Sequence, residues 1–193
     1  METAVDLPLE PCTPVETTPV GQQILQAASR LFYAHGITAT GVDRIVEDAG
    51  TTKRTLYQRF GSKDALVAAY LQNRAHRWQT ELLQAIDDAD PAEGLDIVYD
   101  CAASWAEAGG RGCAFVNAWA EISAADHQAL TAIREEKTWM LTLLTHLAGG
   151  DTSRGQILHL LYEGAQVDAA IGISPDAFAT ARATSHQILQ HRS

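Results

Sequence analysis

Apolar residues recur every three or four positions along most of the chain, which is the spacing of one face of an α-helix. The repeat begins after Thr18-Pro19, a pair typical of a helix N-cap followed by proline at the first helical position. It continues, with short interruptions at glycine and proline, nearly to residue 190. No stretch alternates apolar and polar residues for long enough to predict a β-strand. The pattern therefore predicts an all-α protein of about nine helices.

The first part of the chain is predicted to form short helices separated by tight breaks. Thr40 is expected to cap the second of them, with Asp43 in the capping-box position, and Ser62 is expected to cap the fourth. Two short helices joined by a tight turn have the proportions of a helix-turn-helix unit, here at about residues 42–61. The first four predicted spans are 18–36, 40–50, 52–60 and 63–87.

The rest of the chain is predicted to form longer helices. Their spans are 91–108, 114–123, 126–148, 152–171 and 176–190, with breaks at Gly109-Gly110, Ser123–Asp126, Gly149-Gly150 and Ser174-Pro175. Residues 1–17 lack apolar periodicity and contain three prolines, so they are predicted to be a flexible acidic arm. The expected organisation is this arm, a three-helix helix-turn-helix domain at 18–71, and a larger helical domain at 72–193.

Charge is distributed unevenly between these parts. The chain has a formal net charge of −10, yet residues 21–71 hold six bases and four acids, whereas residues 72–193 hold eight bases and sixteen acids. A small basic part on an acidic chain indicates a site for an anionic partner. The stretch "TTKRTLYQRFGSKDALV" at 51–67 is the most basic segment, with four bases against one acid.

The predicted helix at 52–60 has two distinct faces. At 100° per residue, Leu56 and Phe60 point together toward a small core, and Arg54 and Gln58 lie on the opposite face. Arg is matched to guanine and Gln to adenine in the DNA major groove, while hydroxyls, Lys and Tyr suit phosphate oxygens. The alternative interpretation is a solvated polar face on a structural helix. The coincidence of this face with two caps and a tight turn favours DNA binding.

Residues 20–71 resemble the N-terminal domain of the TetR (tetracycline-repressor) family of bacterial transcription regulators. The resemblance rests on a helix ending in glycine, a following threonine, Ala-Gly, Thr-Leu-Tyr, a phenylalanine and Ser-Lys. In this chain these are Gly36, Thr40, Ala49-Gly50, Thr55-Leu56-Tyr57, Phe60 and Ser62-Lys63. The resemblance implies that Arg54 and Gln58 read bases. It implies contacts to the DNA backbone or groove by Thr40, Thr51, Thr52, Lys53, Thr55, Tyr57 and Lys63.

The resemblance also implies how the remaining residues, 72–193, function. The last two helices are expected to pair with a second copy, which gives a homodimer that binds a palindromic operator. The predicted eighth helix, 152–171, agrees with this, because it is apolar on more than one face. An apolar cavity is expected to hold an unknown small-molecule effector that moves the fourth helix. The candidate lining residues are Trp78, Trp105, Phe115, Asn117, Trp119, Glu121, Trp139, His159 and Tyr162, for which core packing is the alternative.

Classes of function other than a DNA-binding repressor would require other sequence features. The sequence has no metal-ligand pattern, nucleophile elbow or phosphate-binding glycine loop, so no enzyme, metal or cofactor is expected. No apolar run is long enough for a membrane span, and a cytoplasmic, nucleoid-associated bacterial protein is expected. Cys113, near Arg111 at a predicted helix start, allows a thiol-based redox regulator, although an inert buried cysteine is the alternative. A helical adaptor without DNA binding is the remotest alternative.

Overall fold

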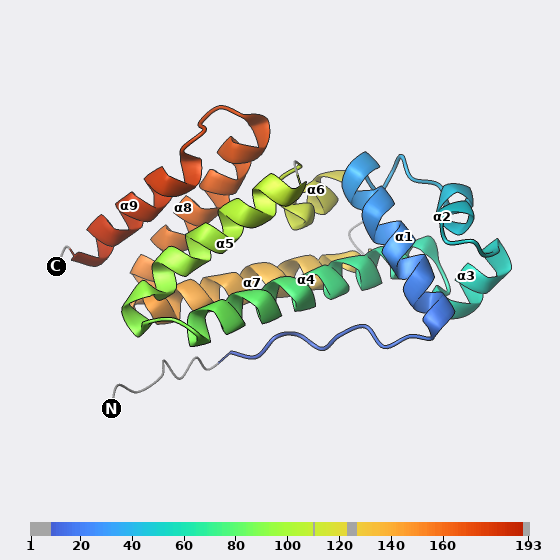
Figure 1. Cartoon of the computed structure of the whole chain (residues 1–193), viewed down its shortest axis with the longest axis horizontal. Coiled ribbons are helices and arrows are strands. Elements are labelled where there is room, and N and C mark those ends of the chain that lie inside the picture. Colours follow the sequence, from blue (N-terminus) through green and yellow to red (C-terminus); the bar gives the residue numbers. More distant parts are fainter. Residues whose placement is uncertain (1–8, 110, 123–126, 191–193) are drawn as a thin grey trace. The chain divides into compact units, whose positions relative to one another are not determined.

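The structure is a computed structural model that describes residues 9–109, 111–122 and 127–190. All regular elements among these residues are helical (Figure 1). The elements are α1 Pro19–His35, α2 Val42–Asp48, α3 Lys53–Phe60, α4 Lys63–Asp87, the short 3-10 helix η1 Pro91–Glu93, α5 Gly94–Gly109, α6 Ala114–Glu121, α7 Ala129–Leu147, α8 Thr152–Ile171 and α9 Ala177–Gln190. The predicted all-α fold class is confirmed. The predicted break at Ser123–Asp126 and the predicted helix start at residue 126 lie outside the described residues, as does Gly110.

Side-chain caps set several helix starts where the sequence predicts them. The Thr18 hydroxyl accepts the N–H of Gly21 at the start of α1. The Ser62 hydroxyl accepts the N–H of Ala65 at 3.0 Å at the start of α4. Each cap supplies an acceptor to a main-chain N–H that has no partner within its own helix.

The predicted start of the second helix is wrong. Helix α2 begins at Val42, and its N-cap residue is Gly41, which has no side chain to supply a cap bond. Thr40 is fully buried, and its hydroxyl donates to the carbonyl of Gly36 at 2.7 Å. The reason is that the last turn of α1 leaves carbonyls without helical partners, and a buried hydroxyl must be paired. Thr40 therefore closes the end of α1 instead of opening α2.

The chain forms two compact units that do not follow a single cut in the sequence. Of the described residues, the N-terminal unit contains those within 12–77 and 114–135, and the C-terminal unit contains those up to 11 and those within 78–113 and 136–190. In the N-terminal unit, α1 contacts α2 and α3, and Ile24, Leu31, Ile45 and Leu56 of these helices are buried. The described residues within 114–135, which the sequence assigns to the second domain, thus cluster with the helix-turn-helix region.

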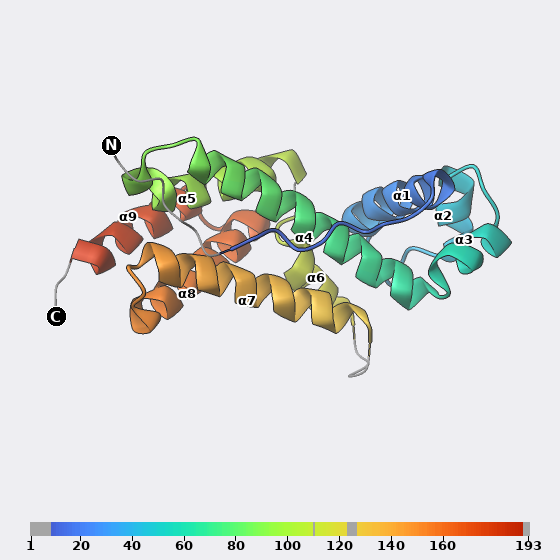
Figure 2. The same cartoon turned by 90° about the horizontal axis from the view of Figure 1, so that it is seen from below.

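The core of the C-terminal unit lies among α5, α7, α8, α9 and the second part of α4. Figures 1 and 2 show α8 and α9 side by side, and both helices contact α5. Trp78 is buried here, packs edge-on against Trp105 at 5.2 Å between ring centroids, and donates its indole N–H to the Met140 sulfur. Tyr99 is also buried and shares a hydrogen bond of 2.8 Å with the Ser185 hydroxyl. The aromatic residues of this unit thus contribute largely to packing.

Residues 9–17 form no regular secondary structure, yet main-chain carbonyls in this segment accept hydrogen bonds. In the C-terminal unit, the Trp139 indole N–H donates to the Glu10 carbonyl at 3.0 Å. In the N-terminal unit, Gln72 donates to the Thr13 carbonyl and His76 Nδ1 donates to the Cys12 carbonyl. Residues 1–8 of the predicted arm lie outside the described part of the chain.

Candidate nucleic-acid interface

Helix α3 is held against the N-terminal unit by one apolar face. The Thr52 hydroxyl accepts the N–H of Thr55 at 3.2 Å and so begins the helix. Leu56 is fully buried and Phe60 is half-buried on the inner side. Gly61 ends the helix with a φ of +78°, a backbone conformation that favours glycine. The helix is therefore short and fixed at both ends.

The opposite face of α3 is exposed and rich in hydrogen-bond donors. Arg54, Tyr57, Gln58 and Arg59 are all exposed, and no acidic residue occurs in the helix. The predicted placement of Arg54 and Gln58 outward, with Leu56 beneath, is confirmed. A helix that presents Arg and Gln to solvent has the groups that pair with base edges in a major groove.

The N-terminal end of α3 already carries an internal ion pair. The Lys53 ammonium lies 2.7 Å from the Asp43 carboxylate of α2. This hydrogen bond and the Asp43 charge raise the pKa of Lys53, which remains exposed. The neighbouring hydroxyls of Thr52 and Thr55 lie 3.0 Å apart, and Thr51 is half-buried. Thr51, Thr52 and Lys53 thus lie at the N-terminal end of the helix, as the sequence predicts.

Lys63 lies at the start of α4 and contacts its own unit. Its ammonium donates to the Ile37 carbonyl at 2.7 Å. An ammonium group has three N–H donors, so this contact leaves further donors for a phosphate oxygen. Thr40, the remaining predicted DNA contact, has no exposed surface and serves the fold, as described above.

The sequence does not reveal that Glu121 belongs to this unit. Its carboxylate, at the end of α6, accepts the main-chain N–H of Thr38 at 2.7 Å. Gly36 has a φ of +92°, and an added Cβ there would lie 2.9 Å from the Glu121 carboxylate. The sequence predicts Glu121 as a ligand contact, and no feature of the sequence pairs it with a residue 83 positions earlier.

The other eight predicted effector residues are divided between the two units. In the N-terminal unit, Phe115 is buried, Asn117 is half-buried and Trp119 is 54% exposed. The other five lie in the C-terminal unit: Trp78, Trp105, Trp139, His159 and Tyr162. Their role in binding an effector stays a prediction.

A polar cluster centred on Lys137 lies within the C-terminal unit. The Lys137 ammonium is 2.7 Å from the Glu163 carboxylate and 3.4 Å from the Cys113 sulfur. Burial lowers the pKa of Lys137, but Cys113 and Glu163 outweigh this effect and hold it above its usual value. Burial lowers the pKa of His159, whose Nε2 atom is 3.6 Å from Glu163, and raises that of Tyr162. The cluster places a cation beside a thiol.

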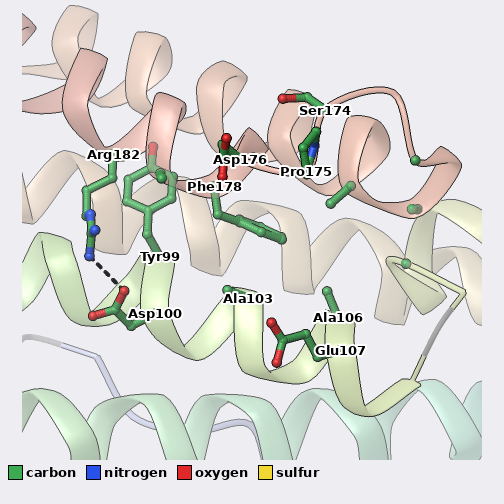
Figure 3. A pocket seen from close by; sticks show the side chains of 15 residues that line it. Tyr99, Asp100, Ala103, Ala106, Glu107, Ser174, Pro175, Asp176, Phe178 and Arg182 are labelled. Carbon is green, nitrogen blue, oxygen red and sulfur yellow. Dashed lines mark hydrogen bonds and ion pairs between the residues drawn. The ribbon is translucent and has the colours of Figure 1, made fainter.

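A cavity of about 610 Å³ also lies within the C-terminal unit, between α5 and the turn that joins α8 to α9 (Figure 3). The Tyr99 and Phe178 rings line it, and Arg182 spans its edge to Asp100 at 2.8 Å. None of the nine predicted effector residues is among its lining residues. Its size is within the usual range for small-molecule sites.

No group of three or more His, Cys, Asp or Glu side chains among the described residues is arranged to hold a metal ion. No helix within the same residues is long and apolar enough to cross a membrane.

The fold and the exposed face of α3 define an all-helical protein with a helix-turn-helix unit. The sequence profile described as "Bacterial regulatory proteins, tetR family" matches residues 24–70. SCO4454, a TetR-family transcriptional regulator from Streptomyces coelicolor, is 30% identical in sequence. The match covers 89% of this chain and 94% of that chain, with a TM-score of 0.79. The chain belongs to the TetR family, and it is a DNA-binding transcription regulator and not an enzyme.

Two further relatives are similar over shorter lengths. The HTH-type transcriptional regulator Rv1255c of Mycobacterium tuberculosis is 38% identical over 74 residues, which are 38% of this chain and 37% of that protein. The HTH-type transcriptional activator FasR of Mycolicibacterium smegmatis is 41% identical over 64 residues, which are 33% of this chain and 29% of that protein. The chain therefore matches only 37% of the length of one of these relatives and 29% of the length of the other.

Proposed function

We propose that the protein is a homodimeric repressor that binds a palindromic operator through α3 and is released from it by a small-molecule effector. The observation that carries the DNA-binding part is the exposure of Arg54 and Gln58 above the buried Leu56. Two-fold symmetry would present two copies of α3 to two half-sites. The adaptor interpretation finds no support in a chain that belongs to a family of DNA-binding regulators.

An exposed apolar stripe on α8 supports the homodimer. Ile157, Leu160, Val167 and Ile171 follow one another at spacings of three, seven and four residues, and Leu160 is 71% exposed. Gly164 lies within the seven-residue interval, four residues after Leu160, and the space where its Cβ would lie is open. Because the opposite face of α8 is already buried in its own unit, this stripe has the spacing of a helix-helix seam with a second copy.

The effector part of the proposal rests on the C-terminal unit. Its cavity between α5 and the α8–α9 turn has the size of a small-molecule site, and its lining includes the rings of Tyr99 and Phe178. A ligand changes operator affinity only if it binds the free and DNA-bound conformations unequally. The repressor assignment follows the family resemblance.

Selection of bound duplexes from a random pool tests the function. We expect enrichment of an inverted repeat, and half-sites separated by about one or more helical turns, since a dimer presents its two helices on one side of the duplex. Recovery of sequences with no common motif would contradict sequence-specific binding. A non-repeated motif would contradict the homodimer.

Redox regulation through Cys113 is a second candidate function, favoured by the Lys137 ammonium 3.4 Å from its sulfur. Reactive cysteines occur beside cationic groups, and a thiol that reacts with hydrogen peroxide is oxidised to a sulfenic acid while the peroxide is reduced to water. A gel-shift experiment with hydrogen peroxide separates the two candidates. Loss of operator binding in the wild type but not in Cys113→Ser would favour the thiol, and equal binding with and without peroxide would exclude it.

A further inference from the structure

A second cavity, of about 430 Å³, lies within the N-terminal unit between α1 and α4. Six of its lining side chains carry the argument: Ser29, Arg30 and Tyr33 from α1, and Asn73, Arg74 and Arg77 from α4. On each helix two of these residues are adjacent and the third follows three or four positions later, so the three lie on neighbouring positions of one side of the helix. The cavity is thus formed by two facing stripes and belongs to neither helix alone.

The charge of this cavity is opposite to that of the chain. Three arginines and no acidic residue line it, although the whole chain carries 24 acidic residues against 14 lysines and arginines. Arg30 does have an acidic partner outside the lining, since its Nη2 atom lies 2.6 Å from Asp48. A guanidinium has five N–H donors and no acceptor, so one contact leaves most of its donors in place. The lining suits an anion.

The aromatic residues orient these donors. The Arg74 guanidinium lies 4.4 Å from the centroid of the Tyr33 ring. Stacking engages the flat face of a guanidinium and leaves its N–H groups directed outward in the plane. Tyr70, which also lines the cavity, is buried and packs against Phe32 at 5.6 Å between ring centroids. The lining therefore includes a side chain of the core of the unit.

The position of the cavity separates it from the predicted phosphate contact of Lys63. Arg74 and Arg77 follow Lys63 on α4 by 11 and 14 residues. At a rise of about 1.5 Å per residue, this corresponds to roughly 16 to 21 Å along the helix. A small anion could occupy the cavity while Lys63 contacts DNA.

We propose that this cavity binds a small organic phosphate. A phosphate monoester has three terminal oxygens and up to two negative charges, which match bidentate contacts from more than one guanidinium. Such a ligand would bridge α1 to α4, and it would alter DNA binding if the two helices are spaced differently in the free and DNA-bound protein. This site lies outside the cavity of the C-terminal unit, so its test does not depend on the proposed effector.

The experiment is isothermal titration of the full-length chain, without DNA, with AMP, inorganic phosphate and adenosine. We expect one saturable AMP site per chain, competition by inorganic phosphate, and no binding of adenosine. Equal binding of adenosine and AMP would overturn the proposal, because the phosphate would then contribute nothing. Absence of saturable AMP binding into the millimolar range would also overturn it.

Variants separate the cavity from general surface charge. The double variant Arg74→Lys/Arg77→Lys keeps the charge but replaces each planar guanidinium group by an ammonium group, which cannot make a bidentate contact to a phosphate. It is expected to weaken AMP binding by about tenfold or more. Arg134→Ala, at an exposed position of α7 in the same unit, is the matched control and is expected to bind AMP as the wild type does. Thermal melting shows whether each variant is folded. If the lysine variant loses operator affinity and the wild type binds no AMP, the arginines serve DNA and the proposal fails.

Discussion

The main-chain N–H of Thr38 donates a hydrogen bond of 2.7 Å to the Glu121 carboxylate. Thr38 lies in the turn between α1 and α2, and Glu121 is the last residue of α6. The turn that leads into the helix-turn-helix is therefore held by a charged group from a distant part of the sequence. Hydrogen bonds to ionised acceptors are stronger than those between neutral groups.

Removal of this carboxylate is expected to weaken operator binding. In Glu121→Ala the Thr38 amide loses its partner, and the turn before α2 gains conformational freedom. This freedom is lost when the protein binds DNA, which lowers the affinity. A loss of about 1.4 kcal/mol, or about tenfold in affinity, is expected from the usual strength of such a bond. Gel-shift titration measures it. Glu121→Gln keeps an acceptor oxygen and should lose less, and Glu135→Ala is an exposed control in the same unit. Equal affinity in all three variants would show that the contact does not support α2.

Asp43 is expected to restrain non-specific DNA binding. Its carboxylate pairs with Lys53 at 2.7 Å beside the reading helix. Asp43→Asn removes a negative charge there and makes Lys53 available to phosphate, so affinity for random duplexes should rise a few-fold, with a steeper dependence on salt. Fluorescence anisotropy at several salt concentrations measures both quantities. Glu47→Gln removes an exposed charge from the same helix and is the control. An identical gain in both variants would mean that net charge alone is responsible.

The α8 stripe gives a prediction about assembly. Leu160→Glu places a charge in the centre of the proposed seam, where it would be desolvated without a partner, so the dimer should dissociate to monomers. Light scattering coupled to size exclusion measures the mass. Thr142→Glu adds the same charge at an exposed position of α7 and should remain a dimer. A dimer of unchanged stability in Leu160→Glu would place the interface elsewhere.

Glu136 is expected to make stability depend on pH. Burial raises its pKa to about 8, although the hydrogen bond from Gln79 lowers it, so the folded protein holds a proton at neutral pH. The unfolded chain releases that proton near pH 4.5, its ordinary pKa. Between these values the folded state binds more protons. The free energy of unfolding therefore falls as pH rises from about 4.5 to 8, by up to about 1.4 kcal/mol per pH unit.

Urea unfolding at fixed protein concentration tests this effect. Glu136→Gln cannot titrate, yet its amide oxygen can still accept from Gln79. Its stability should therefore fall less steeply than that of the wild type over this window, and it should be the more stable protein above pH 8. Glu135→Gln, on the exposed neighbour, is the control and should follow the wild type. If the free energy of unfolding depends on pH equally in Glu136→Gln and wild type, the Glu136 side chain is an ordinary ionised carboxylate in the folded protein.

Local signals explain which parts of the structure the sequence could predict. Both ends of α1 and α3 and the start of α4 are set by caps and glycines within a few residues of each helix, and the inward side of α3 follows from helical periodicity. The predicted cap at Thr40 is wrong because a threonine before a helix can either cap that helix or hydrogen-bond to the end of the preceding one. Both partners lie within a few residues of Thr40, so the local sequence does not distinguish them. The Glu121–Thr38 bond and the arginines of the α1–α4 cavity join residues from separate helices. No periodicity along one helix reveals such pairings.

Base reading by α3 is the central claim, and Gln58→Ala tests it most directly. Affinities of wild type, Gln58→Ala and Lys63→Ala are measured for every single-base variant of one half-site of the selected operator. We expect Gln58→Ala to abolish the preference at one base pair, at a cost of about 1–3 kcal/mol for the preferred base. Lys63→Ala should weaken binding to all variants alike. A uniform loss across all base pairs for Gln58→Ala would contradict base reading by this face.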